Sequence, residues 1–215
     1  FKMTGEGISP ADNFFIQSFL SFSYFMLPSS LVVMTVLISQ TEIKNDGIRK
    51  MLSLPVSSAR LCLAKFCVLL TLLAAEIALM LGAYFPSARI ASRQNHYSFG
   101  IDPLYVAKIC GVIFMISIPM AAVYWLLSVL LKNPVASVGI GLATVVPIVL
   151  FINVKAWFAY PMCYPMMLIA SEMGRLSAKA ASSSLALTPW IPVAVSIAAA
   201  ALGISCVRYG KSERK

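Results

Sequence analysis

The stretch TEIKNDGIRKMLSLPVSSARLCLAKF, residues 41–66, decides how the chain must fold, because it is a polar interruption between two long apolar runs. The run before it, residues 14–39, contains no charged residue, and the run after it, residues 61–85, contains only Lys65 and Glu76. A helix needs about 20 apolar residues to cross the roughly 30 Å hydrocarbon core of a bilayer. The stretch therefore connects two membrane-spanning helices.

A short amphipathic helix is predicted inside this connection, at about residues 46–54. Asp46 can cap the start of such a helix, and Gly47 follows it. The apolar residues keep the i, i+3, i+4 spacing of one helix face: Ile48, Met51 and Leu52. The polar residues between them face elsewhere: Arg49, Lys50 and Ser53.

A proline ends this predicted helix. Pro55 pushes Leu54 into extended backbone, and Ser57 or Ser58 can then cap the second span. The connection thus contains a helix set crosswise between two spans. Such a helix can lie on lipid headgroups, or its apolar face can dock into a groove on a partner protein.

The composition indicates an all-α integral membrane protein, a polytopic helix bundle with one transmembrane domain over residues 1–215. The chain has 215 residues, of which 60% are hydrophobic and 12% charged, with a mean hydropathy of +0.86. Ordinary soluble domains carry about 25% charged residues. The net charge of +9 does not indicate a nucleic-acid partner, because basic residues flank the spans of membrane proteins in any case.

Five runs are long and apolar enough to span: residues 14–39, 61–85, 104–131, 135–154 and 187–206. Ten Lys and Arg residues follow the first, third and fifth runs, against seven on the other side. Positive residues favour the cytoplasmic side, so the C-terminus is predicted to be cytoplasmic and the start of the chain to lie outside. The chain starts at Phe1, and one further helix upstream would give six spans.

The segment before the last span, about residues 155–186, is predicted to be a partly re-entrant or interfacial outer element. Its aromatic residues, Trp157, Tyr160 and Tyr164 among them, suit the membrane interface. Pro161 and Pro165 prevent one continuous helix, and a mildly amphipathic helix follows. The alternative, a disordered outer loop, fits less well because the segment is too apolar.

Enzyme motifs are lacking in the sequence. Gly210, Lys211 and Ser212 imitate the end of an ATP-binding loop, but Ser205 stands where the first glycine is needed. The five cysteines are scattered, without metal-ligand spacing. Glu76 is the one acid inside a predicted span; it is either a pathway or gating residue, or a hydrogen-bonding group between helices.

A family resemblance rests on the opening stretch. It resembles the permeases of type-2 ATP-binding-cassette exporters at these positions: Glu42, Gly47, Leu52, Leu54, Pro55, Ser57, Arg60 and Lys65. The stretch FAYPMCYPMMLI, residues 158–169, looks like that of the lantibiotic-immunity and bacitracin-resistance branch. The resemblance covers the chain from the first span onward, and it implies a coupling helix at residues 46–54 that docks on a separate ATPase.

The resemblance implies a membrane subunit that forms half of a translocation path in a bacterial plasma membrane. A second permease copy or a paralogue would complete the path, and cytoplasmic ATPase subunits would bind ATP and Mg²⁺, with no cofactor on this chain. Docking is assigned to Ile48, Met51 and Leu52, with Glu42, Arg49 and Lys50 as polar contacts. The implied substrate is an antimicrobial peptide or a related amphipathic toxin.

Two alternatives from other classes remain open. One is a membrane scaffold or accessory subunit that uses the same amphipathic segment to bind lipid or a partner. The other is a secondary carrier centred on Glu76, which is weakly supported because proton relays usually need several ionisable groups.

Overall fold

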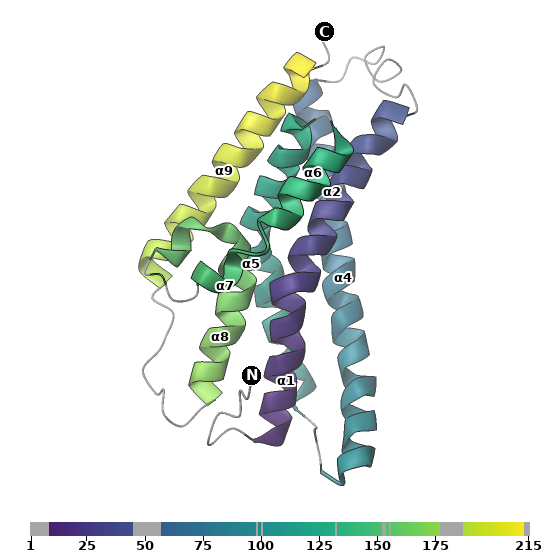
Figure 1. Cartoon of the computed structure of the whole chain (residues 1–215), viewed down its shortest axis with the longest axis vertical. Coiled ribbons are helices and arrows are strands. Elements are labelled where there is room, and N and C mark those ends of the chain that lie inside the picture. The colour runs from purple at the N-terminus through teal and green to yellow at the C-terminus, as the bar shows by residue number, and fades with distance from the viewer. Residues whose placement is uncertain are drawn as a thin grey trace.

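The described part of the chain is built from helices and has no strand. The computed structural model describes residues 9–44, 57–97, 99, 101–131, 133–151, 154, 156–176 and 187–212 (Figure 1). Five helical stretches within it are long and apolar enough to cross a membrane: Pro10–Gln40, Ala59–Asn95, Pro103–Leu130, Pro134–Phe151 and Trp190–Arg208. The prediction of an all-α polytopic membrane protein with five spans in this chain is confirmed.

The first span consists of α1 (Pro10–Ser21), a π-helical turn (Phe22–Met26) and α2 (Leu27–Lys44). Ser9 caps α1 by accepting a hydrogen bond from the backbone N–H of Asp12 (3.1 Å). Proline has no N–H and its ring crowds the carbonyl four residues earlier, so Pro28 favours a widened turn just before it. The first span is therefore a continuous helical stretch with a π-helical turn before Pro28.

The second span, α4 (Ser58–Asn95), is much longer than predicted. The predicted span ends at Phe85, but the helix passes through Pro86 and ends only at His96, whose φ of 49° is left-handed. Thirty-eight residues give a rod of about 57 Å, against a hydrocarbon core of about 30 Å. Tyr84 and Ala88 are buried on either side of Pro86, and this packing holds the helix together.

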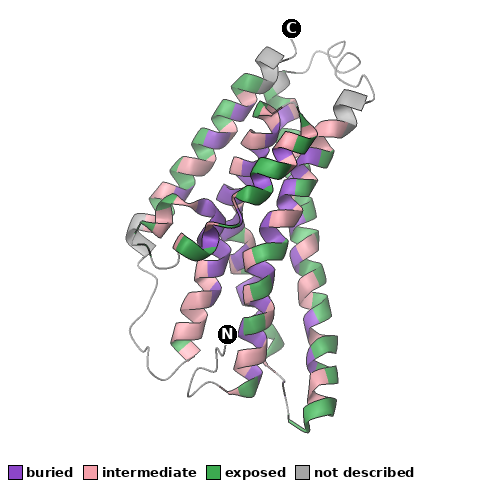
Figure 2. Ribbon diagram, viewed as in Figure 1, coloured by how far each residue is buried: buried purple, intermediate pink, exposed green. Residues whose placement is uncertain are grey.

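The third span, α5 (Pro103–Leu130), is the central helix of the bundle. It packs against α2, α4, α6, α8 and α9, and Figure 2 shows buried residues along most of its length. Four consecutive residues, Pro119 to Ala122, are buried, and at about 100° per residue they cover every face of the helix. A helix that is apolar on all sides belongs in the core, which is the position that α5 takes.

The fourth span is interrupted. It consists of α6 (Pro134–Ala143), a turn at residues 144–147, and the single helical turn α7 (Ile148–Phe151), whereas one apolar span over 135–154 was predicted. Pro147 cannot donate to Ala143 and crowds its carbonyl, which explains the break. Asn133 caps α6 by accepting from the N–H of Val135 (3.0 Å).

Two 3₁₀ turns, Trp157–Ala159 and Pro161–Cys163, lead into α8 (Tyr164–Leu176), and α9 (Leu187–Ser212) completes the chain. Pro161 and Pro165 each lie in the first turn of a helical element, where a missing N–H costs nothing. The ends of α2, α5 and α9 lie together with the starts of α4 and α6, at what we call the C-terminal end (Figure 1). The opposite end, called the far end, contains the start of α1 and the end of α4.

Candidate functional site

The predicted docking segment, residues 46–54, lies outside the described residues, and with it Gly47, Ile48, Arg49, Lys50, Met51, Leu52, Leu54 and Pro55. The structure describes the helices that flank it. Glu42 lies in the last turn of α2, and α4 starts after Ser57 at its N-cap position. Both flanking ends lie at the C-terminal end of the bundle (Figure 1). The docking residues remain a prediction.

A polar contact joins α2 to α4 inside the membrane span. Ser30 Oγ lies 2.6 Å from both carboxyl oxygens of Glu76, and it can donate to either. Both side chains are half-buried. Glu76 was predicted as a notable residue, whereas Ser30 was not, because nothing in the sequence distinguishes it from the five other serines of residues 14–39. The contact ties together the two helices that flank the docking segment.

The interruption of the fourth span is closed by tyrosines from elsewhere in the chain. Tyr160 donates its hydroxyl hydrogen to the carbonyl of Thr144, and the Thr144 and Tyr124 hydroxyls are 2.9 Å apart. The ring of Tyr160 stacks on Phe151, with centroids 4.6 Å apart. Burial raises the pKa of Tyr160, so the phenol keeps its proton. A residue predicted for the interface thus satisfies the carbonyl of Thr144, the C-cap residue of α6, where the helix ends.

The second tyrosine-proline pair, Tyr164 and Pro165, lies where the outer segment forms hydrogen bonds within itself. Tyr164 donates to the carbonyl of Phe158 (2.5 Å), and the thiol of Cys163 donates to the carbonyl of Tyr160 (2.9 Å). Burial raises the pKa of both Cys163 and Tyr164 to about 12, so both groups stay protonated. The described part of this segment is ordered by its own side chains, which is unlike a disordered loop.

An apolar cavity of about 150 Å³ lies beside this segment, between α5, α8 and α9. Its lining joins the aromatic segment to the last span: Val112, Ile116, Trp157, Tyr164, Met167, Leu168 and Trp190. Tyr164 meets Trp190 edge-on, with centroids 5.4 Å apart. The indole N–H of Trp190 is buried and has no hydrogen-bond partner among the described residues. Sequence reasoning missed Trp190 because it belongs to a separate apolar run.

A three-residue polar cluster fastens α8 to α5 toward the far end. Tyr105 donates to Glu172 (2.8 Å), and Arg175 donates to both Tyr105 (2.9 Å) and Glu172 (2.9 Å). The guanidinium also lies 5.6 Å from the centroid of the Tyr105 ring. The carboxylate and the phenol both raise the pKa of Arg175. The three-residue spacing of Glu172 and Arg175 was the signal in the sequence, and their partner Tyr105 was not predictable.

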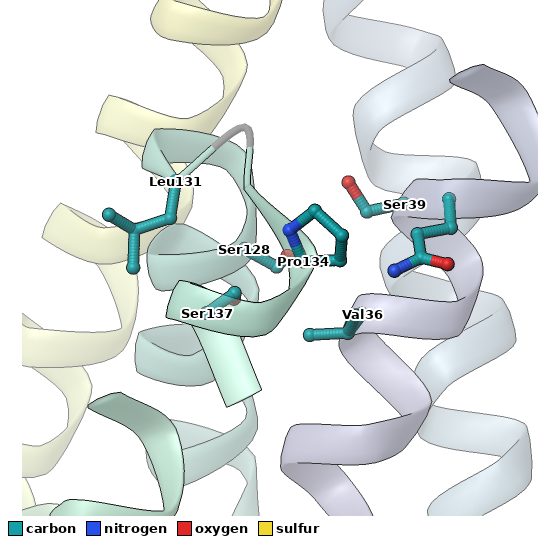
Figure 3. Close-up of a pocket in the computed structure, with 7 residues that line it drawn as sticks. Val36, Ser39, Ser128, Leu131, Pro134 and Ser137 are labelled. Atoms are coloured by element: carbon teal, nitrogen blue, oxygen red, sulfur yellow. The ribbon is translucent and has the colours of Figure 1, made fainter. Parts of the chain in front are cut away.

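Near the C-terminal end, α2 and α6 approach each other closely. A side chain at Gly141 would place its Cβ 2.6 Å from Val32 Cγ1, so any residue larger than glycine would force Val32 to shift. A small cavity of about 10 Å³ lies nearby between α2, α5 and α6, and Figure 3 shows Ser39, Ser128 and Ser137 around it. This volume is at the lower limit for one water molecule. These polar residues mark a helix-packing site rather than a ligand site.

Among the described residues, no group of three or more His, Cys, Asp or Glu side chains could hold a metal ion. What the arrangement offers is a set of helices linked at defined points: Ser30 to Glu76, Tyr160 to Thr144, and Tyr105 to Glu172. One end of α2 and one end of α4 lead into the predicted docking segment.

Comparison with known proteins identifies the family. The family described as ABC-2 family transporter protein matches residues 1–147 of the 215-residue chain, which includes the first three spans and the predicted docking segment. No curated protein and no solved structure matches the chain. This family implies partnership with an ATP-binding-cassette ATPase subunit. The chain belongs to the ABC-2 family of transporter proteins and is a multi-pass membrane permease subunit of an ABC transporter.

Proposed function

We propose that this permease is half of an exporter, driven by cytoplasmic ATPase subunits that dock on residues 46–54 and hold the ATP and Mg²⁺. A second permease copy or a paralogue supplies the other half of the path. In this arrangement the C-terminal end of the bundle faces the cytoplasm, in a bacterial plasma membrane.

The observation that carries this proposal is the bond between Ser30 and Glu76. The docking segment is flanked by α2 and α4, and this hydrogen bond ties the two helices at a point remote from the segment itself. A displacement of the segment would therefore be passed to both helices together. Because α4 is a single helix of 38 residues, its movement would reach the far end as a rigid-body rotation or shift.

A charge on the apolar face of the docking segment tests the proposal. Met51→Asp should abolish copurification of the ATPase and substrate-stimulated ATP hydrolysis, because a carboxylate would have to be desolvated in the groove that accepts Met51. Ser53→Asp is the matched control, since it adds the same charge to the same segment on another face. Normal copurification and transport in the Met51→Asp protein would refute the docking assignment.

The proposed substrate is an antimicrobial peptide of the lantibiotic or bacteriocin type, or a related amphipathic toxin, expelled for immunity or resistance. Support comes from the resemblance of residues 158–169 and from the apolar cavity beside Trp157 and Trp190, which suits an apolar side chain. Cells that express the permease with its ATPase should survive higher concentrations of a lantibiotic than cells with an ATPase unable to hydrolyse ATP. Equal survival would refute this substrate class.

The carrier alternative makes a different prediction at Glu76. An exporter driven by ATP should keep its efflux in Glu76→Gln, because the amide can still bond to Ser30. A proton-coupled carrier would lose transport in the same variant. The scaffold alternative predicts partner or lipid binding without any efflux, which the survival assay separates from export.

A further inference from the structure

The far end of α4 has an open pocket that the transport proposal does not use. Its volume is about 320 Å³, in the range of about 300–1,000 Å³ that small-ligand sites occupy. Tyr84 and Ala88 are buried at its base, while Arg89 and Arg93, one helical turn apart on α4, are exposed at its edge. The pocket thus combines an apolar floor with a cationic rim.

The wall opposite α4 is held in place by its own contacts. The chain reverses at His96, whose left-handed φ of 49° ends α4. The backbone N–H of Phe99 then donates to Ser92 Oγ on α4 (3.0 Å). The ring of Phe99 packs edge-on against Phe14 of α1, with centroids 5.6 Å apart. Ile101 and Pro103 complete the wall, so the pocket is a formed feature of the fold.

Neither arginine forms an ion pair with an acidic side chain among the described residues. The acids in neighbouring elements accept hydrogen bonds at the starts of their own helices. Asp12 accepts from Ser9 Oγ (2.7 Å) at the start of α1, and Asp102 accepts from the N–H of Leu104 (3.1 Å) at the start of α5. Two guanidinium groups are therefore available to an anion from outside the chain.

The position of the pocket along α4 indicates which anion can reach it. Arg89 comes 31 residues after Ser58, or about 46 Å along the helix, and Tyr84 about 39 Å. A bilayer with its headgroups is about 40–45 Å thick. If α4 enters the membrane at its first turn, the apolar floor lies at headgroup depth and the arginines lie at the outer edge of the headgroups.

We propose that this pocket binds the phosphate-bearing headgroup of an anionic membrane lipid. Arg89 and Arg93 pair with the phosphate, for which the planar guanidinium has matching geometry. Phe85 and Ile101 contact the apolar part of the lipid next to its headgroup. The site does not depend on which substrate the transporter carries, so it can be tested on the permease alone.

The test is lipid binding by the purified permease in a neutral detergent, measured by native mass spectrometry. Phosphatidylglycerol should bind more tightly than phosphatidylcholine, because only the former has a net negative charge. The double variant Arg89→Gln/Arg93→Gln should weaken phosphatidylglycerol binding by about tenfold or more, the usual effect of losing charge-assisted hydrogen bonds. The matched control is Arg60→Gln/Arg208→Gln, which removes two exposed arginines at the C-terminal end and should keep the binding.

Two further arms separate a lipid site from other anion sites. Glycerol 3-phosphate and inorganic phosphate should bind far more weakly than the lipid, and Ile101→Ser should weaken lipid binding without changing glycerol phosphate binding. Equal losses in both arginine pairs would overturn the proposal, since diffuse electrostatics would explain them. Free phosphate that binds as tightly as the lipid would also overturn it. A melting temperature unchanged from the wild type establishes that each variant is folded. If the glutamine pair does not fold, Arg89→Lys/Arg93→Lys replaces it; this variant should also bind phosphatidylglycerol more weakly, because lysine lacks the planar guanidinium that pairs with phosphate.

Discussion

Ser30 and Glu76 face each other across two helices, with the serine hydroxyl 2.6 Å from each carboxyl oxygen. A carboxyl group inside a membrane span has a high free-energy cost unless it has such a partner. Ser30→Ala should therefore lower the free energy of unfolding by about 1–3 kcal/mol, because it leaves the carboxyl group unpaired. Ser30→Ala/Glu76→Gln should recover part of this loss. Thermal unfolding in detergent measures both values, and an unchanged melting temperature in Ser30→Ala would contradict the prediction.

The contact of α2 with α6 predicts an asymmetry between two glycines of one helix. Gly141→Ala should destabilise the protein by about 1–3 kcal/mol, the usual cost of overpacking, since its Cβ would lie 2.6 Å from Val32 Cγ1. Gly139→Ala is the control, because a Cβ there meets nothing within 4 Å. Val32→Ala should rescue Gly141→Ala by removing the clashing methyl groups. Equal melting temperatures for the two alanine variants would exclude this close contact.

The interrupted fourth span predicts a specific role for one phenol. Tyr160→Phe keeps the ring that stacks on Phe151 but removes the hydroxyl that donates to the carbonyl of Thr144. A buried carbonyl without a partner costs about 1–3 kcal/mol, so residues 144–151 should exchange amide hydrogens faster. Tyr97→Phe is the control, as Tyr97 is exposed. Faster exchange in both variants, or in neither, would argue against the role of Tyr160.

The cluster at the far end predicts how firmly α8 is attached to α5. Tyr105→Phe removes the hydroxyl that bonds to Glu172 and Arg175. Because the Arg175 side chain is 58% exposed, the loss should be small, about 1 kcal/mol. Local exchange should rise in residues 164–176 and remain unchanged in α9. The ion pair between Glu172 and Arg175 is present in both proteins, so the difference comes from the hydroxyl alone. Unchanged exchange in residues 164–176 of Tyr105→Phe would contradict this role of Tyr105.

The five spans could be predicted from the sequence because apolar length alone specifies a membrane helix. The length of α4 could not be predicted, because Pro86 and the polar residues after it are typical of a loop sequence. Tertiary burial of Tyr84 and Ala88 preserves the helix there. The break after Ala143 has a visible cause in Pro147, yet its partners Tyr124 and Tyr160 come from other segments and carry no local signal.

The candidate site likewise contains residues that the sequence identifies and contacts that it does not. Glu76 is recognisable as a lone acid in an apolar run, whereas its partner is 46 residues away along the chain. Tyr160 and Tyr164 are recognisable as aromatic residues next to prolines, but their hydrogen bonds to Thr144 and Phe158 depend on the folded chain. The docking residues 48–52 lie outside the described residues and stay a prediction from amphipathic spacing and resemblance.

The unequal lengths of α4 and the fourth span have a consequence for the surrounding lipid. Residues Pro134–Phe151 would rise only about 27 Å even as one continuous helix, and the interruption shortens them further. Val146 and Leu150 nevertheless lie exposed on this side. The apolar surface of the bundle is thus shorter along the membrane normal beside the fourth span than it is beside α4. We expect the lipid beside the fourth span to thin to match it, so that this flank is sensitive to acyl-chain length.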